Sequence, residues 1–171
     1  GLKRGDVIGI FMENSPRYFE ICWGAQRAGL YYTCISSRLT VDEVAYIVND
    51  CGAKVLFSSK EKAAVAAEVP AQCPNLTNCY AVGGGIEGFD EYEAARDAQP
   101  AERIADESNG ADMLYSSGTT GRPKGIKVAL PEGPLEEAPS LIALTQLLYG
   151  FSSDSIYLSP APFYHAAPLR F

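Results

Sequence analysis

The chain has 171 residues, of which 47% are hydrophobic and 20% charged, a composition that is ordinary for one globular domain or part of one. Its formal net charge of −7 argues against nucleic acid as a partner, because phosphate backbones select basic surfaces. The amino-terminal residues lack the apolar core of a signal peptide, and the longest charge-free run, residues 138–153, is too short to span a bilayer. We expect that run to form a buried helix.

The cysteines point to free thiols rather than to disulfides or a metal site. Their number, 5, is odd, and no two of them have the C-x-x-C spacing of metal and redox motifs. Free thiols are typical of a reducing compartment, so we expect a cytoplasmic protein in which each cysteine packs as a small apolar residue. The cysteines are Cys22, Cys34, Cys51, Cys73 and Cys79.

Strand and helix signals alternate along the chain. Short apolar runs predict strands, and these runs cover residues 7–11, 31–35, 54–57, 78–82, 126–130 and 156–158. Helix signals lie between them. The expected helices begin after Ser15 and after Thr40, cover residues 60–68, are capped by Asp90 and Glu93, and carry Leu141, Leu144 and Leu148 on one face.

Two of these helices have clear end signals. Ser15 before a proline is typical of a helix N-terminus, and Gly29 is a suitable stop. Thr40 and Glu43 form a capping box for a helix that ends near Gly52. The β-α-β-α order with short connections favours an α/β fold with a largely parallel sheet flanked by helices. Ligands of such sheets bind beyond the carboxyl ends of the strands.

Residues 115–125 read Tyr-Ser-Ser-Gly-Thr-Thr-Gly-Arg-Pro-Lys-Gly and combine groups that suit a polyphosphate. Glycines let backbone N–H groups approach an anion, hydroxyls donate hydrogen bonds, and Lys124 supplies a compact positive charge. The spacing is not that of a Walker A loop, so we predict a strand–loop–strand phosphate grip. A surface turn is the alternative. The predicted phosphate-binding residues are Ser116, Ser117, Gly118, Thr119, Thr120, Gly121 and Lys124.

This segment resembles the phosphate-loop signature of the adenylate-forming superfamily, which comprises acyl-CoA synthetases, luciferases and peptide-synthetase adenylation domains. The match includes residues 117–121 and 123–125. Other stretches look like the opening of bacterial acyl-CoA synthetases, namely residues 2–7, 13–16, 23–29, 31–33, 38–40 and 48–54. Cys34 and Ser36 depart from the family, which often has proline and asparagine there. The resemblance covers residues 1–171 and implies the N-terminal portion of the large ATP- and acyl-binding domain.

A second stretch, Pro162-Phe163-Tyr164-His165, resembles the family motif that lies against the carboxylate substrate. The resemblance implies that His165 sits beside the substrate carboxylate and the phosphate loop, with Phe163 and Tyr164 lining the acyl or nucleotide surface. Taken alone, a single histidine is more often a core or surface residue, and the two aromatic side chains are as often plain core packing.

The resemblance implies a two-step reaction. A carboxylate attacks the α-phosphate of ATP to give an acyl-adenylate and pyrophosphate, and coenzyme A then displaces AMP to form the thioester. Lys124, Thr119 and His165 are implied to act in catalysis, Mg²⁺ would bridge phosphate oxygens, and no metal site made of protein side chains is expected. The expected substrate is a fatty acid, with aryl or alicyclic acids as the alternative.

The chain lacks the family's Tyr-Gly-x-Thr-Glu and Thr-Gly-Asp motifs, and the small C-terminal domain with its catalytic lysine. We interpret it as the N-terminal portion of a longer enzyme and expect it to be inactive by itself. Two alternatives remain. One is a non-catalytic nucleotide-binding regulatory fragment. The other is a dinucleotide-dependent oxidoreductase using Gly83–Gly88, which satisfies G-x-G-x-x-G but lies late in the domain for that fingerprint.

Overall fold

The computed structural model describes residues 1–116, 121–133, 135 and 140–170. One six-stranded sheet has the order β5-β4-β3-β1-β2-β6, and all of its neighbouring strands are parallel. The predicted α/β fold with a largely parallel sheet is therefore confirmed. The strands are β1 (Val7–Phe11), β2 (Tyr31–Ile35), β3 (Ala53–Ser59), β4 (Asn78–Val82), β5 (Asp90–Glu91) and β6 (Ala111–Asp112).

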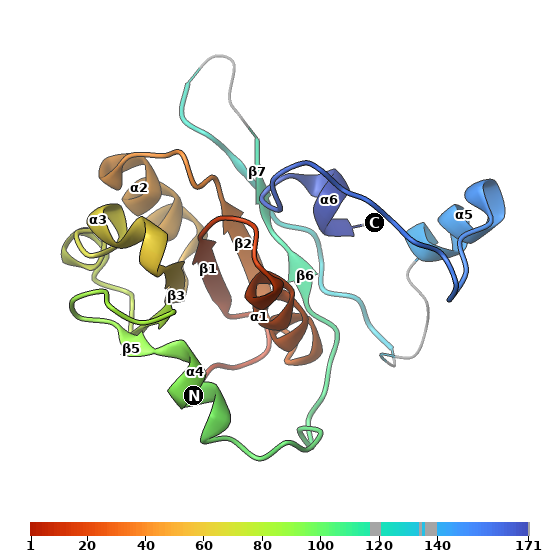
Figure 1. The fold of residues 1–171 in the computed structure, drawn as a ribbon, viewed down its shortest axis with the longest axis horizontal. Helices are drawn as coiled ribbons and strands as arrows, with labels where there is room; N and C mark the ends of the chain where they lie inside the picture. The colour runs from red at the N-terminus through yellow and green to blue at the C-terminus, as the bar shows by residue number, and fades with distance from the viewer. Residues whose placement is uncertain (117–120, 134, 136–139, 171) are drawn as a thin grey trace.

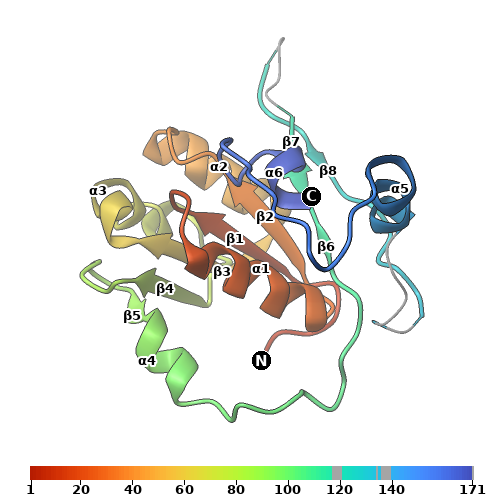
Figure 2. The same ribbon diagram turned by 45° about the vertical axis from the view of Figure 1, so that its right-hand side comes forward.

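Helices cover both faces of this sheet. In Figures 1 and 2, α2 and α3 lie on one face and α1 lies on the other. The helices of this part are α1 (Pro16–Arg27), α2 (Val41–Cys51), α3 (Ala63–Ala66) and α4 (Tyr92–Asp97), with 3-10 turns at Lys60–Lys62 and Pro70–Gln72. Because a parallel strand must begin at the same edge as its neighbour, α1 crosses from β1 to β2 and α2 from β2 to β3, whereas a loop without a helix connects β4 to β5.

The predicted helix ends of α1 and α2 are confirmed. The Ser15 hydroxyl accepts a hydrogen bond from the Arg17 N–H at 3.2 Å. The Thr40 N–H donates to the Glu43 carboxylate at 2.9 Å, as a capping box requires. Gly52 ends α2 in the left-handed conformation with φ of 69°, which costs a glycine little.

The prediction that Asp90 caps a helix is wrong. Asp90 belongs to β5, where it is paired with Tyr80, and α4 begins at Tyr92 after Glu91. Glu93, the other residue predicted for this cap, lies in the first turn of α4 and accepts a hydrogen bond from the Gly83 N–H at 3.2 Å. Asp90 therefore pairs with β4 at the edge of the sheet instead of capping the helix, as the local sequence pattern had predicted.

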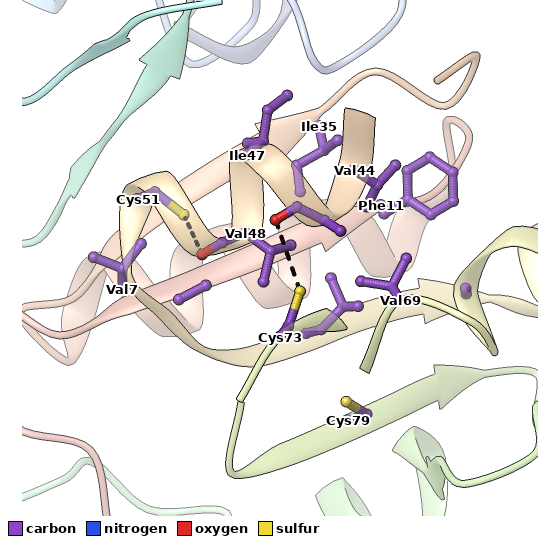
Figure 3. Packing of buried hydrophobic residues seen from close by; sticks show 14 of the residues in the cluster. Val7, Phe11, Ile35, Val44, Ile47, Val48, Cys51, Val69, Cys73 and Cys79 are labelled. Carbon is purple, nitrogen blue, oxygen red and sulfur yellow. Dashed lines mark hydrogen bonds between the residues drawn. The ribbon is translucent and has the colours of Figure 1, made fainter. Parts of the chain in front are cut away.

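Alternating side chains of β1 build two hydrophobic layers. Val7 and Phe11 point toward α2 and α3, whereas Ile8 and Ile10 point toward α1. Figure 3 shows Val44 and other α2 side chains packed over β1. Parallel strands covered on both faces need this continuous apolar pattern, so the short run at residues 7–11 identified the central strand correctly.

The chain leaves the sheet after β6 and forms a separate hairpin. Strand β7 (Leu114–Tyr115) pairs antiparallel with β8 (Gly125–Ile126), and the hairpin projects beyond the sheet in Figure 1. The predicted strand–loop–strand arrangement is therefore confirmed, although β8 ends at Ile126 rather than at residue 130. The following backbone is held instead by the Tyr31 hydroxyl, which donates to the Val128 carbonyl at 2.6 Å.

Two predictions for the carboxyl-terminal part fail. Residues 156–158 form no strand, and Ile156 is 100% exposed. The apolar run at residues 138–153 does contain a helix, α5 (Ser140–Tyr149), but Leu147 is 81% exposed and the helix lies apart from the sheet in both views. A last helix, α6 (Ala166–Arg170), returns to the sheet. No helix among the described residues is both long and apolar enough to cross a membrane.

Candidate functional site

The two stems of the predicted phosphate loop are held together by backbone hydrogen bonds. The Ser116 N–H donates to the Lys124 carbonyl at 3.0 Å, and the Lys124 N–H lies 3.4 Å from the Ser116 hydroxyl oxygen. Ser116, Gly121 and Lys124 are all exposed. The other predicted phosphate-binding residues, at positions 117–120, lie outside the described residues. The structure thus brings Ser116 and Lys124 face to face at the base of the loop.

A glycine is required where the second stem begins. A Cβ on Gly125 would lie 2.7 Å from Met113 Cε and 2.8 Å from Tyr115 Cζ, closer than real Cβ contacts. The glycine that ends the Pro-Lys-Gly part of the motif therefore lets the backbone of the second stem lie close to the Tyr115 ring. Across the described part of the chain no ion pair engages the Lys124 ammonium, so its charge can face an anion.

Helix α2 anchors both stems. The Tyr46 hydroxyl donates to the Pro123 carbonyl at 3.0 Å, and the Arg122 guanidinium lies 5.0 Å from the centre of the Tyr46 ring. The Tyr115 hydroxyl donates to the Asp50 carboxylate at 2.5 Å. Burial raises the pKa of Tyr115, and the hydrogen bond to Asp50 raises it further, so the phenol stays protonated and remains a donor.

The second predicted motif is fastened to the end of β1. The Asn14 side-chain N–H donates to the Ala161 carbonyl at 3.1 Å, and the Phe163 N–H donates to the Asn14 side-chain oxygen at 2.8 Å. The Phe163 ring then packs against α1, with ring centres 4.5 Å from Phe19 and 5.5 Å from Tyr18. Phe163 thus contributes to the core layer under α1, which was the alternative reading of its sequence pattern.

His165 lies at the exposed end of this motif. Its backbone N–H donates to the Pro162 carbonyl at 3.0 Å, which closes a turn, and its ring centre is 4.6 Å from that of Tyr164. Farther on, the Arg170 guanidinium donates to both carboxylate oxygens of Asp112, at 2.6 and 3.1 Å. That ion pair ties α6 to β6, directly before the β7–β8 hairpin. The roles of Phe163, Tyr164 and His165 at an acyl pocket stay a prediction.

Both motifs lie at the carboxyl edge of the sheet. The hairpin follows the carboxyl end of β6, and Asn14 follows the carboxyl end of β1. Strands β1 and β3 are neighbours in the sheet. The chain leaves β1 toward β2 on one side and leaves β3 toward β4 on the other, so the two connections diverge between β1 and β3. Such switch points are the usual ligand sites of parallel sheets. Among the described residues, no hydrogen bond or ring contact joins residues 162–165 directly to the loop stems.

One cavity of about 680 Å³ opens at the opposite edge. Its lining includes Lys54, Val55 and Asn78, which lie at the amino ends of β3 and β4. The Lys54 ammonium there is paired with the Asp6 carboxylate at 2.8 Å. The carboxyl edge is the candidate functional site, because it carries the Ser116 hydroxyl, the exposed Lys124 and His165.

The glycine-rich stretch at residues 83–88 has a backbone role. It connects β4 to β5, whereas a dinucleotide fingerprint must open a helix at this point. Gly83, Gly84, Gly85 and Gly88 all have φ between 67° and 77°, a region that L side chains rarely adopt. The Gly83 N–H is already bound by the Glu93 carboxylate, which would repel a pyrophosphate.

Comparison with known proteins assigns the family. A family model described as AMP-binding enzyme matches residues 1–171. The chain belongs to the AMP-binding enzyme family. The long-chain-fatty-acid–CoA ligase FadD13 of Mycobacterium tuberculosis is 30% identical over 99% of this chain, and the feruloyl-CoA synthase of an Amycolatopsis species is 32% identical over 99%. These matches take in 32% and 31% of the two relatives, so the chain spans about a third of their length.

Solved structures agree with this assignment. The inhibitor-bound N-terminal domain of FACL13 from Mycobacterium tuberculosis has a TM-score of 0.75 at 25% identity, over 99% of this chain and 41% of its own. A structure from Rhodopseudomonas palustris has a TM-score of 0.80 at 22% identity, over 99% of this chain and 42% of its own, which shows the fold alone. The predicted membership of the adenylate-forming superfamily, with acyl-CoA ligases as relatives, is confirmed.

Sequence reasoning missed the side chains that hold the two motifs in place. Asn14 and Asp50 were counted only within family-like strings, and Tyr46 only as a member of a predicted helix. The i, i+4 spacing of the last two puts them on one face of α2, which is a signal that the sequence does contain. Nothing in the sequence shows which segment that face meets.

Proposed function

We propose that the protein is an AMP-forming acid–CoA ligase. It joins a carboxylic acid to the α-phosphate of ATP and then transfers the acyl group to coenzyme A. The observation that carries the proposal is the hairpin that presents Ser116 and Lys124 side by side at the carboxyl edge of the sheet, in a chain of the AMP-binding family. Relatives named as acid–CoA ligases and synthetases support the same reaction class.

The chemical problem in the first step is that one anion attacks another. Neutralising charge as it develops lowers this barrier most effectively when the donors are held in advance. Lys124 would stabilise the departing pyrophosphate, while the hydroxyls and amides of residues 116–121 would hold the β- and γ-phosphates. At an effective dielectric near 20, one charge pair at ~4 Å is worth about 4 kcal/mol.

Mg²⁺ enters the proposal as an ion carried by phosphate oxygens of ATP, where it would supply further charge neutralisation. The described residues offer no group of three or more His, Cys, Asp or Glu side chains that could hold a metal ion. The five buried, unpaired cysteines support a reducing compartment, for which we propose the cytoplasm.

The proposed substrate is a fatty acid. FadD13 is named for long-chain fatty acids, but other relatives are named for 3-methylmercaptopropionate, benzoate and ferulate. The acid therefore has to be found by assay. We further propose that residues 1–171 are the N-terminal portion of the large ATP- and acyl-binding domain, and that this portion is inactive without the remainder.

Carboxylate-dependent exchange of pyrophosphate into ATP tests the proposal. The assay would use this chain and the full-length protein that carries it, with a panel of fatty and aromatic acids. We expect exchange only in the full-length protein, with one preferred class of acid. No exchange with any acid, together with measurable ATP binding, would favour a regulatory nucleotide-binding protein instead.

A variant at His165 distinguishes an effect on use of the acid from an effect on ATP binding. In the full-length protein, His165→Ala is expected to raise the KM for the acid or lower the rate with it, while ATP affinity changes little. A variant that loses only ATP affinity would show that His165 is not at the acyl site.

A further inference from the structure

Asn14 uses both halves of its amide to hold the chain segment that carries His165. Its N–H group reaches the Ala161 carbonyl at 3.1 Å, and its oxygen receives the Phe163 N–H at 2.8 Å. The partners are 147 and 149 residues away in sequence. The side chain thus pairs with the segment as a neighbouring strand would, with one donor and one acceptor.

An amide is well suited to this task. Asparagine and glutamine offer a neutral donor and acceptor on the same planar group, whereas a carboxylate can only accept and would face the Ala161 carbonyl. Glutamine is one methylene longer, so its amide would not occupy the same place from this backbone position. Asn14 therefore matches the segment both in polarity and in reach.

The residues on both sides of Asn14 are themselves held by side-chain hydrogen bonds. Glu13, the preceding residue, accepts a hydrogen bond from the Ser59 hydroxyl at 2.6 Å, at the end of β3. Ser15, the following residue, caps α1. Asn14 therefore extends from the switch point between β1 and β3, which is a rigid part of the sheet.

Two further contacts limit how the held segment can move. The Phe163 ring is packed on Tyr18 and Phe19 of α1, and Arg170 is paired with Asp112 of β6. His165 lies between these two attachment points and makes its own turn with Pro162. Of the three attachments, only the Asn14 amide binds the backbone of the segment directly.

We propose that Asn14 is a positioning residue that sets where residues 162–165 present the acid-facing side chains. This rests on the proposed acid–CoA ligase function. In this proposal Asn14 acts without contact with the reacting atoms. Its effect comes through the placement of His165, and a displacement of about 1 Å can cost about 100-fold in rate.

The test compares Asn14→Ala and Asn14→Asp with Asn49→Ala in the full-length protein. Asn49 is a matched control, because its amide also donates to a distant backbone carbonyl, that of Gln72, at 2.9 Å. One readout is hydrogen exchange of peptides covering residues 161–165. The other is the separate KM and kcat values for acid and ATP in pyrophosphate exchange.

We expect Asn14→Ala to speed exchange of the Phe163 amide by about fivefold, since one hydrogen bond is lost. We expect kcat/KM for the acid to fall by about tenfold or more, with KM for ATP within about twofold. Asn14→Asp keeps the acceptor for the Phe163 N–H, so its amide exchange should change less than in Asn14→Ala. Asn49→Ala should change neither readout.

Unchanged exchange at residues 161–165 in Asn14→Ala would overturn the proposal, whatever the kinetics. Faster amide hydrogen exchange with an unchanged kcat/KM for the acid would also overturn it, because the hydrogen bonds would then be purely structural. A failure of the proposed acid–CoA ligase function would give a different result. The wild-type protein would show no acid-dependent pyrophosphate exchange, and the positioning role would fail with it, while amide exchange would still report the Asn14 hydrogen bonds.

Discussion

The parallel sheet and the segment that follows the hairpin contain similar apolar residues but bury them very differently. Phe11 and Leu56 in the sheet are 0% exposed. Leu147 in α5 is 81% exposed, and Ile156 and Leu158 after it are 100% and 84% exposed. The sheet thus buries its apolar side chains within the described residues, whereas the segment after the hairpin leaves these ones exposed.

The difference arises from the number of strands and helices that each region can pack against. Strand β1 has a strand on each side and helices on both faces, all from the first half of the chain. Helix α5 meets no such layer within the described residues, and its side chains Leu144, Leu147, Leu148 and Tyr149 are exposed to water. Periodicity predicts that a segment will be a helix, but burial depends on what that helix meets.

The largest expected effect is in the sheet. Phe11→Ala should lower the free energy of unfolding by about 3–5 kcal/mol, because the ring is fully buried beneath α2 and its loss leaves a cavity. Urea unfolding of the chain measures it. Ile126→Ala, at a position that is 61% exposed, is the control and should cost less than about 0.5 kcal/mol. Similar losses in both variants would show that burial does not set the cost of removing these side chains.

The next effect is on activity and belongs to the hairpin. Lys124→Ala in the full-length protein should lower pyrophosphate exchange by about 100- to 1000-fold, which is the usual loss for one charge-stabilising donor. Its melting temperature should not move, because the side chain is exposed. Thr119→Ala is expected to act in the same direction.

Lys127→Ala is the matched control for this variant, since Lys127 follows the same hairpin and its ammonium lies over the Tyr31 ring at 4.5 Å. It should retain most of the exchange activity. Equal losses in the two lysine variants would show a general effect of charge rather than a specific contact with phosphate.

A smaller effect is expected where the two regions meet. Tyr46→Phe and Asp50→Ala each remove one hydrogen bond between α2 and the loop stems. We expect a loss of pyrophosphate exchange of about tenfold, with less than about 1.5 kcal/mol of lost stability. Asp42→Ala is the control on the same helix, because its carboxylate accepts from Gln72 at 3.0 Å, away from the loop. If Asp42→Ala lowers activity as much, α2 does not act through these anchors.

The smallest effect should be in α5. Leu147→Ser in the 171-residue chain should change the free energy of unfolding by less than about 0.5 kcal/mol, since the side chain is already in water. The same substitution in the full-length protein gives the comparison. A loss above about 2 kcal/mol only in the longer protein would show that Leu147 becomes buried there.

Local patterns predicted much of this fold. The apolar runs at residues 7–11 and 31–35 became central strands, and the capping box at Thr40 began α2. The run at residues 156–158 had the same apolar character but formed no strand, because no strand of the described residues pairs with it. The sequence alone could not distinguish these two outcomes.

The site divides in the same way. The composition of residues 115–125 and the motif at residues 162–165 were readable from the sequence, because each is a contiguous string with its own chemistry. Their attachments were not. Tyr46 reaches Pro123 across 77 residues and Asn14 reaches Ala161 across 147, so only the folded chain shows these contacts.

The sequence by itself determined where α1 and α2 begin and which apolar runs form β1 and β2, because caps and periodicity act over a few residues. It also determined the family, through a hydroxyl- and glycine-rich string with a lysine at fixed spacing. The tertiary structure alone decided the strand order, the exposure of α5 and the hold of Asn14 on the His165 segment. These depend on contacts between distant residues, whose free energy is gained only when the whole sheet has formed.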